Sequence, residues 1–538
     1  MNWKTIFYLS IFIIISACGL KNENKKDLSD TDFIYIKEKS FMNRGKIFFP
    51  VMLNYAVGYR NVGDKFYISP ILQYENPEIF ESNSKISIEN QIRAHFTLIN
   101  EMGFNTIRIC FDRVFYDDES KAFYFPADKK KLFLLKDYKL IFEGLKSLFK
   151  IANDNKLKII LLIKSPVENA ELESFTKLLL QEFNNETALF AYDFFNEPLY
   201  FDLVNSSNKN TFRKKADAYK IVKKWKQMML EYAPNQLFTI GFAEPLEVFE
   251  WDPSILPVDF IAFHTYHPLR VPNEIYWYSK YISKPWMIGE TSLPADGDSI
   301  SYNEQKQFYK EVFKRVINCG GSGIGWWEFQ EPATGNFEAK YTAVLNHKSV
   351  TKTKDGKYSV IGTVKPVVDE ILKLKDFRKK ENCDCNSNYY NMLGYNNFKL
   401  IGKVINENTM QPIEGAVVRG WNIDWSIGQN TFTNRNGEFT LYSNDICTYF
   451  EISAPNMSNS KFSFNTNYIA ISNYNSTSDL PNQKLEYHNI SYKPFLKLPI
   501  DSIGNDNYIF NFDESKFNKA KFVGNMGIIK LEHLDFVK

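Results

Sequence analysis

The chain has 538 residues, more than the roughly 100–200 of an ordinary domain, which predicts two domains, one of them large. It carries 65 Lys and Arg against 63 Asp and Glu, a net charge of +2, and so lacks the basic excess typical of nucleic-acid-binding proteins. Hydrophobic residues make up 44% and aromatic residues 16% of the chain, which excludes wholesale disorder and leaves many rings for packing or for ligand contact.

Residues 1–18 have the features of an export signal. Lys4 supplies a positive start, and Ile6–Ile15 is apolar but too short to span a bilayer. The segment ends in Ile15-Ser16-Ala17-Cys18, which resembles the lipobox of bacterial lipoproteins. The resemblance implies that Cys18 is lipidated and anchors the protein to the outer membrane, on its periplasmic or its cell-surface side. The alternative is an ordinary secretory signal with an incidental cysteine. Residues 19–43 are expected to form a flexible tether.

The five cysteines that remain are an odd number, which argues against a complete disulfide framework. Cys110 and Cys319 lie in apolar segments and are expected to be buried thiols. Cys383 and Cys385 are closer together than the cysteines of usual zinc pairs and have no histidine nearby, so no metal site is predicted there. No later segment is long and apolar enough to be transmembrane.

Residues 44–377 alternate between short apolar strands and segments of helical periodicity, which is typical of repeated βα units. Apolar residues recur three or four positions apart in the helical segments, as at Ile141, Leu145 and Leu148. Eight strands in about 330 residues predict an α/β fold, a (β/α)8 TIM barrel. The predicted strands are Ile47–Asn54, Thr106–Phe111, Lys158–Lys164, Phe190–Phe195, Leu237–Gly241, Asp259–Tyr266, Trp286–Glu290 and Gly323–Glu328.

Residues 378–397 read as a linker, and after it strands recur without helices, which predicts a small all-β sandwich over residues 398–480. The β-rich tail, residues 481–538, is expected to complete the sandwich or to pack elsewhere. The spacing of Gly402, Pro412, Gly415 and Gly437 resembles the carboxypeptidase regulatory-like (transthyretin-like) domain, which implies a spacer without chemistry. The expected strands are Lys399–Asn406, Ala416–Trp421, Thr431–Thr433, Glu438–Ser443 and Tyr449–Ala454.

Barrel enzymes carry their working residues at the carboxyl ends of the strands. The fourth predicted strand is followed by Asn196-Glu197-Pro198, and the seventh ends in Gly289-Glu290. Two carboxylates that converge across a cleft are what glycoside hydrolysis requires, one to protonate the leaving oxygen and one to act at the anomeric carbon.

Asn-Glu-Pro after the fourth strand and Gly-Glu at the seventh resemble clan-A glycoside hydrolases, most of all the family 5 cellulases and mannanases. The resemblance implies that Glu197 is the acid/base and Glu290 the nucleophile of a retaining double displacement. Their carboxyl groups would then lie about 5–5.5 Å apart. It implies no metal and no organic cofactor.

Other strand ends match the same family. Arg108, on the second strand, would help to keep Glu290 ionised, although a purely structural ion pair is the alternative. Asn196 would hydrogen-bond the sugar 2-hydroxyl. In the family, the histidine at the position of His264 supports the acid/base, and the tyrosine at that of Tyr266 contacts the nucleophile.

Two further residues are candidates for the sugar-binding subsite. Trp327 would form its floor while Trp326 packs outward, although a shift of one residue would exchange the two. Asn54, at the end of the first strand, is a weaker candidate. Here the third strand ends in Ile163-Lys164-Ser165-Pro166, without the sugar-binding histidine of many family members, which leaves the subfamily open. Aromatic loop residues could add sugar platforms or simply pack: Trp251, Tyr276, Trp277 and Tyr278.

The sequence therefore predicts a membrane-anchored, retaining β-glycosidase that acts as a monomer on a β-linked polysaccharide or oligosaccharide. β-1,4-Glucan or β-mannan is the expected substrate, on family grounds only. Two alternatives remain: a non-catalytic, glycan-binding surface lipoprotein, and a transglycosylase that uses the same residues with a different acceptor.

Overall fold

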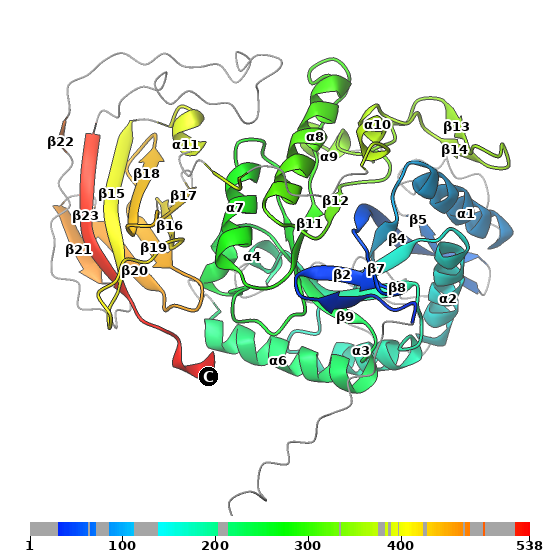
Figure 1. Ribbon diagram of the computed structural model, residues 1–538, viewed down its shortest axis with the longest axis horizontal. Coiled ribbons are helices and arrows are strands. Elements are labelled where there is room, and N and C mark those ends of the chain that lie inside the picture. Colours follow the sequence, from blue (N-terminus) through cyan, green and yellow to red (C-terminus); the bar gives the residue numbers. More distant parts are fainter. Residues whose placement is uncertain are drawn as a thin grey trace, which may run out of the picture.

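The computed structural model describes residues 31–62, 65–70, 85–111, 138–202, 213–332, 335–374, 382–385, 389–395, 397–422, 428–465, 468–473, 488–489 and 522–537. A barrel with helices around it is followed by two packed sheets, antiparallel except for one parallel pair of strands (Figure 1). The predicted lipobox at Cys18 lies outside the described residues, as do parts of the linker and of the tail. Among the described helices, none has the length and apolar character needed to cross a membrane.

Eight parallel strands form the barrel. Each pairs with the next in chain order, and β12 closes the ring by pairing with β4, so the predicted (β/α)8 barrel is confirmed. Its strands are β4 (Val51–Val62), β6 (Thr106–Cys110), β7 (Lys158–Leu162), β8 (Leu189–Asn196), β9 (Leu237–Phe242), β10 (Ile261–His264), β11 (Trp286–Glu290) and β12 (Ile324–Trp326). β4 runs on beyond the barrel and forms a hairpin with β5 (Lys65–Pro70).

The longer helices surround the barrel (Figure 1), and their buried apolar residues pack into its core. α8, for example, begins at a capping box in which Ser301 and Glu304 satisfy each other's backbone N–H groups. The longer helices are α1 (Lys85–Glu101), α2 (Tyr138–Asp154), α3 (Ala170–Glu182), α6 (Lys215–Tyr232), α7 (Val271–Tyr281) and α8 (Tyr302–Asn318). The shorter ones are α4 (Pro198–Phe201), η2 (Pro245–Phe249), α9 (Phe337–Lys340), α10 (Val367–Ile371), α11 (Tyr389–Met392) and η5 (Asp535–Val537).

A three-stranded sheet covers the amino-terminal end of the barrel. It consists of β1 (Tyr35–Lys37), β2 (Ser40–Asn43) and β3 (Lys46–Ile47). Phe41 is fully buried and packs edge-on against Phe190 and Phe260, which lie at the amino ends of β8 and β10. The sequence had suggested that residues 35–43 belong to a tether. They are instead part of the folded unit, because Phe41 buries its apolar surface against the open end of the barrel.

The two sheets of the C-terminal sandwich face each other across a separate apolar core that includes Val418, Leu441 and Phe450. One sheet has the order β18 (Glu438–Ser443), β15 (Phe398–Asn406), β23 (Phe522–Leu531) and β22 (His488–Asn489). The other has β17 (Gly428–Phe432), β16 (Val417–Trp421), β19 (Tyr449–Ser453), β20 (Ser460–Asn465) and β21 (Tyr468–Asn473). The tail enters the sandwich through β23, which pairs with β15 in parallel. A small hairpin on the barrel side is formed by β13 (Val350–Lys352) and β14 (Ser359–Ile361).

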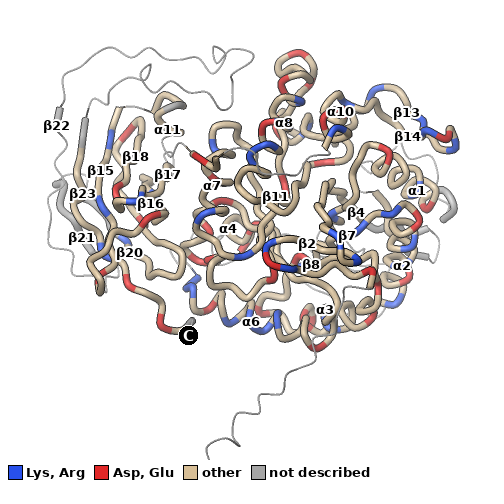
Figure 2. The backbone as a smooth tube through the Cα atoms, viewed as in Figure 1, with Lys and Arg blue, Asp and Glu red and all other residues tan. Residues whose placement is uncertain are grey.

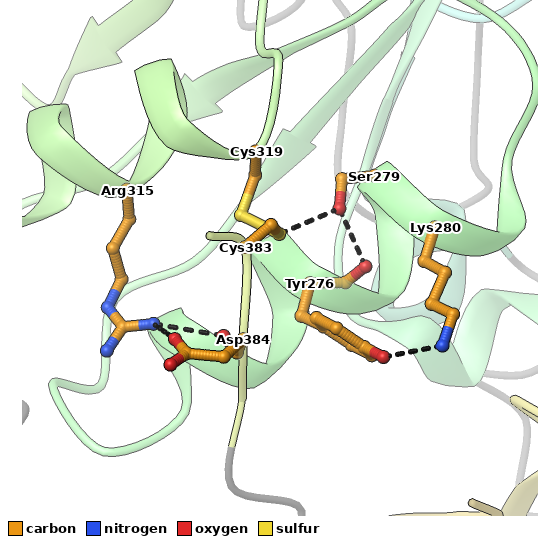
Figure 3. Close-up of a disulfide and its surroundings, with 7 residues drawn as sticks. All are labelled: Tyr276, Ser279, Lys280, Arg315, Cys319, Cys383 and Asp384. Atoms are coloured by element: carbon orange, nitrogen blue, oxygen red, sulfur yellow. Dashed lines mark hydrogen bonds and ion pairs between the residues drawn. A yellow bond between two sulfur atoms is a disulfide. The ribbon is translucent and has the colours of Figure 1, made fainter. Parts of the chain in front are cut away.

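A disulfide joins Cys319, at the end of α8, to Cys383 in the segment before the sandwich (Figure 3). The expectation that Cys319 is a free buried thiol is therefore wrong, because an odd cysteine count excludes a complete framework but not a single bridge. Arg315 donates to the backbone carbonyl and the carboxylate of the neighbouring Asp384 and holds the same segment. Cys110 is a buried thiol outside any disulfide, as predicted.

Barrel and sandwich are joined by buried polar contacts. The Lys215 ammonium, 5% exposed, pairs with Asp252 of the barrel at 3.0 Å and donates to the Ser453 hydroxyl and the Met457 carbonyl of the sandwich, both at 2.8 Å. The Trp277 indole donates to the Gly415 carbonyl.

Elsewhere acidic and basic residues alternate over the barrel helices, in keeping with the small net charge (Figure 2).

Candidate active site

Glu197 and Glu290 stand at the carboxyl ends of β8 and β11, where parallel strands of a barrel direct their last side chains into one mouth. A carboxylate oxygen of each lies within 4.8 Å of the other and of a ring nitrogen of His264. Glu197 has left-handed backbone geometry, with φ of 47°, and its N–H donates to the Gly241 carbonyl at 2.6 Å. The structure thus brings together the two carboxylates that are 93 positions apart in the printed sequence.

Glu290 is 5% exposed and is surrounded by donors. Arg108 Nη1 lies 2.5 Å from its Oε1, and the Tyr266 hydroxyl donates to its Oε2. Burial alone would raise the pKa of Glu290, but His264, Arg108 and Tyr266 stabilise the ionised form and hold the pKa below its ordinary value. Burial, reinforced by Glu290, keeps the pKa of Tyr266 well above its ordinary value, so this hydroxyl remains a donor.

Arg108 is fixed by acceptors on every side. Its Nε and Nη2 contact Asp193 Oδ2 at 2.9 and 2.8 Å, and Nη1 donates to Asn54 Oδ1 at 3.1 Å. Nη2 also donates to Asn196 Oδ1 at 2.9 Å. A guanidinium held in this way cannot turn from Glu290, so its positive charge stays beside the carboxylate.

The sequence had suggested Asn54 and Asn196 as sugar-binding residues, and the structure gives each a contact within the protein. Asn54 is fully buried, and its amide N–H groups donate to the carbonyls of Gly289 and Trp326, both at 3.0 Å. All of these contacts position Arg108 and the strand ends. Asn196 is half-buried and uses its Oδ1 on Arg108.

His264 connects the two carboxylates. Its Nδ1 lies 2.8 Å from Glu197 Oε1 and 3.6 Å from Glu290 Oε1. Its Nε2 is buried and has no hydrogen-bond partner among the described residues. The hydrogen bond from His264 to Glu197 therefore fixes the Glu197 carboxyl beside Glu290.

Three residues that the sequence did not single out complete the site: Asp193, Gly241 and Gly289. A Cβ atom on Gly241 would lie 3.0 Å from His264 Nε2 and 3.1 Å from both Arg108 Nη2 and Asp193 Oδ2. On Gly289 it would lie 3.0 Å from the His264 ring. Both glycines leave room for the polar side chains that fill the mouth. Asp193 gave one signal in the sequence, because an acid inside an apolar strand needs a buried cation as its partner.

Trp326 packs outward, as the sequence predicted, while the role of Trp327 as a subsite floor stays a prediction. Trp326 is fully buried and packs outward against Phe308 and Tyr309 of α8, while its indole donates to the Thr342 carbonyl. Trp327 is half-buried against a cluster at the carboxyl ends of β4, β6 and β7. Its ring therefore lies at the carboxyl-terminal face of the barrel.

Three of the four aromatic loop residues are fully buried and pack within the protein: Trp251, Trp277 and Tyr278. None of the three offers a surface to a sugar, so of the two interpretations left open by the sequence, packing is correct for them. Tyr276 is partly exposed and stacks on Phe432 of the sandwich.

Glu197, His264 and Glu290 also form the arrangement that could hold a metal ion. A cation between them would lie close to the Arg108 guanidinium, which occupies one oxygen of Glu290 at 2.5 Å. The repulsion between two buried cations disfavours a metal at this place. The donor set suits proton transfer and attack by a carboxylate better than it suits metal binding.

No protein-family model matches the chain, and no curated protein matches it. Its structure is similar to that of the exo-β-1,4-mannosidase Op5Man5 from Opitutaceae bacterium strain TAV5, with 14% identity and a TM-score of 0.44 over 63% of this chain and 61% of that one. It is similar to the endo-1,4-β-mannanase from Rhizomucor miehei, with 13% identity and a TM-score of 0.42 over 63% of this chain and 99% of that one. A β-glucosidase from Thermotoga maritima matches with 11% identity and a TM-score of 0.41 over 62% of this chain and 98% of that one. The chain thus covers less than two thirds of the length of the first of these proteins.

Proposed function

We propose that the protein is a retaining glycoside hydrolase that cleaves β-glycosidic bonds. The observation that carries the proposal is the approach of a Glu197 oxygen to within 4.8 Å of a Glu290 oxygen. Carboxyl groups about 5–5.5 Å apart suit a double displacement, whereas an inverting enzyme needs about 6.5–9.5 Å to admit water between them. The fixed donors around Glu290 suit a nucleophile that stays ionised, and the contact with His264 positions Glu197 for proton transfer.

In the first step the Glu290 carboxylate attacks the anomeric carbon while Glu197 gives its proton to the glycosidic oxygen. The bond from the anomeric carbon to that oxygen breaks, the leaving sugar departs as an alcohol, and a glycosyl ester remains on Glu290. In the second step Glu197, now ionised, takes a proton from water as the water oxygen attacks the anomeric carbon and frees Glu290.

The substrate proposed is a neutral β-linked polysaccharide or oligosaccharide of the β-1,4-glucan or β-mannan type. Its support is the sequence resemblance to family 5 cellulases and mannanases at Asn196-Glu197-Pro198 and Glu290, and the chemistry of the site. We also propose that the sandwich is a carboxypeptidase regulatory-like domain, on the spacing of Gly402, Pro412, Gly415 and Gly437, and that the protein acts as a monomer.

The activity is tested with the lipid-free protein on β-glucans, mannans, xylans and aryl β-glycosides, beside Glu290→Gln and Glu197→Gln. We expect both variants to lose at least about 10²–10⁴-fold in kcat on natural linkages. Glu197→Gln should recover most on aryl glycosides whose leaving group needs no proton. Glu438→Gln, on the exposed edge of β18, is the matched control and should keep full activity.

Two outcomes contradict the proposal. A wild-type protein that binds one of these glycans but releases no sugar would be a glycan-binding protein. Early product with inverted anomeric configuration, followed by NMR, would exclude the double displacement. Added alcohol acceptors separate hydrolysis from transglycosylation, since a transglycosylase would give mainly the alkyl glycoside.

We also propose that the protein is exported and held at the outer membrane by lipid on Cys18. The support is the sequence of residues 1–18 and the Cys319–Cys383 disulfide, because disulfides persist in oxidising compartments. Mass spectrometry of the membrane-fraction protein should find an acylated Cys18 at the N-terminus. A Cys18→Ala variant should appear in the soluble fraction, and a wild-type protein that is soluble and unmodified would refute the anchor.

A further inference from the structure

Glu197 is held in a backbone conformation that residues with a side chain rarely adopt. Its φ of 47° lies in the left-handed region, and it is the last residue before α4. Left-handed residues other than glycine cost free energy and persist only where the surrounding structure fixes them. The contacts that fix this backbone therefore also set the direction of the Glu197 carboxyl.

The helix that follows Glu197 is very short. The Glu197 carbonyl accepts the N–H groups of Tyr200 and Phe201, at 2.9 and 3.0 Å, and α4 is complete after 4 residues. A helix of one turn is not stable by itself in water. The place of α4, and with it the conformation of Glu197, must therefore be set by other segments of the chain.

Glu247, in η2, holds the first turn of α4. Its Oε1 accepts the N–H of Leu199, two residues beyond Glu197, and the N–H of Ala243, directly after β9, both at 3.1 Å. Glu247 is 1% exposed, and its Oε2 has no hydrogen-bond partner among the described residues. One buried oxygen atom thus joins the chain after β8 to the chain after β9.

The other anchors of α4 lie farther from the acid/base. The Tyr200 hydroxyl donates to Glu244, and the carboxylate of Asp202, at the end of α4, pairs with Arg213 at 2.5 Å. Of these three contacts, only that of Glu247 is made to the backbone of α4. It is also the one nearest in the chain to the acid/base.

The sandwich fixes η2 from its other side. Asn459 donates to the Phe249 carbonyl at the end of η2, at 2.7 Å, and η2 packs against β16 and β19. The acceptor oxygen of Glu247 therefore has a fixed position, to which the sandwich contributes.

Glu247 holds the N–H of Leu199 without placing a charge beside the acid/base. Burial raises the pKa of Glu247 well above its ordinary value, and the nearby carboxyl groups of Glu197 and Glu250 raise it further. The backbone donors of Leu199 and Ala243 act the other way but do not outweigh burial. The uncharged form is therefore favoured, and a glutamine, which has the same shape and the same acceptor oxygen, should be able to replace it.

We propose that Glu247 is a positioning residue for the acid/base Glu197 and acts through the N–H of Leu199. The inference rests on the proposed hydrolase function. Without this acceptor α4 loses its tie to β9, and Glu197 is free to relax towards an ordinary φ, which turns its carboxyl from the glycosidic oxygen. The steps that need proton transfer by Glu197 are then slowed, whereas attack by Glu290 is not.

The test compares kcat/KM on phenyl β-glycosides, whose leaving group needs a proton, with kcat/KM on dinitrophenyl β-glycosides, whose leaving group needs none. Glu247→Met removes the acceptor at similar volume, Glu247→Asp withdraws it by one methylene group, and Glu247→Gln keeps it. Glu186→Met is the matched control. Glu186 Oε1 also accepts a backbone N–H, that of Ala188 at 2.9 Å, but just before β8, at the opposite end of the strand from Glu197.

We expect Glu247→Met to lose about 10–10²-fold in kcat/KM on phenyl glycosides and no more than about twofold on dinitrophenyl glycosides. Glu247→Asp should show a smaller fall of the same kind, and Glu247→Gln and Glu186→Met should keep the wild-type ratio of the two values. On dinitrophenyl glycosides kcat and KM of Glu247→Met should fall together, because Glu197 is also the base that helps water to release the glycosyl-enzyme.

An unchanged ratio in Glu247→Met, whether from full activity or from equal losses on both substrates, would overturn the proposal. A Glu247→Gln protein as impaired as Glu247→Met would overturn it as well. If Glu247→Met does not fold, the ratio in Glu247→Asp decides in the same way. A wild-type protein inactive on every glycoside would instead refute the hydrolase function, so the two failures are distinct.

Discussion

Replacement of Asp193 by asparagine tests whether the buried pair with Arg108 organises the site. Asp193 Oδ2 accepts from Arg108, and its Oδ1 accepts the Gly241 N–H at 2.9 Å, so both oxygens are in use. An asparagine keeps the shape but turns one acceptor into a donor. Either Arg108 or Gly241 would then face an N–H group.

The magnitude follows from burial and distance. Both side chains are 1% exposed, with 2.8 Å between Nη2 and Oδ2. At an effective dielectric constant of ~20, charges at this distance attract by about 6 kcal/mol. Desolvation offsets part of this, and removal of one partner of a buried pair costs about 3–5 kcal/mol. We expect Asp193→Asn to lose that much free energy of unfolding. Because Arg108 also fixes Glu290, kcat should fall about 10²-fold.

The assay is equilibrium urea unfolding, followed by tryptophan fluorescence, together with hydrolysis of an aryl glycoside. Asp259→Asn is the matched control, since Asp259 also accepts from a cation, Lys226, and from a backbone N–H. It lies at the amino end of β10 and is about a quarter exposed, so we expect a loss of about 1 kcal/mol with full activity. An Asp193→Asn protein within 1 kcal/mol of the wild type, or one with undiminished kcat, would refute the reasoning.

Three further predictions concern other parts of the fold. Burial lowers the pKa of His95 to about 3, so stability is fully present above the unfolded pKa of 6.5 and is lost as pH falls towards 3. Between pH 7 and pH 4 the wild-type protein should lose about 3 kcal/mol of unfolding free energy through His95, and His95→Gln should lack this part of the loss. An unaltered pH dependence in the variant would contradict this. The Cys319–Cys383 bridge spans 64 positions, for which loop entropy predicts about 4 kcal/mol, so Cys383→Ser should lower the urea midpoint and make it insensitive to reductant. Gly241→Ala should cost about 1–3 kcal/mol and at least tenfold in kcat, since its Cβ atom would lie 3.0 Å from His264 Nε2. A fully active Gly241→Ala protein would show that the mouth can adapt.

The barrel could be predicted because its strands are local apolar runs separated by helices of regular period. Glu197 and Glu290 could be located for the same reason, since each ends such a run. The hydrogen-bond and ion-pair partners of the site residues could not be predicted in this way. Asp193 and Arg108 are 85 positions apart, and nothing in the local pattern of either strand indicates that they pair. Gly241 likewise reads as an ordinary strand residue until the ring of His264 is placed against it.

The terminal regions show a different limit of the sequence. Residues 35–43 are polar enough to resemble a tether, and only the open end of the barrel gives Phe41 a place to be buried. The disulfide forms because the chain brings Cys383 back to Cys319 at the end of α8. The spacing of the cysteines in the sequence does not predict this pairing. In both cases the outcome depends on a contact between residues far apart in the sequence, which the local pattern does not contain.

The charges of the site explain how one buried cluster can serve both steps of the proposed reaction. In the proposed reaction Arg108 contributes +1, Asp193 and Glu290 each −1, and Glu197, which enters as the acid, nothing, so these four side chains carry −1. In the glycosyl-enzyme Glu290 is an ester and Glu197 is ionised, and the sum is again −1. The cluster never has to bury additional charge, which is the most costly change that a low-dielectric site can undergo.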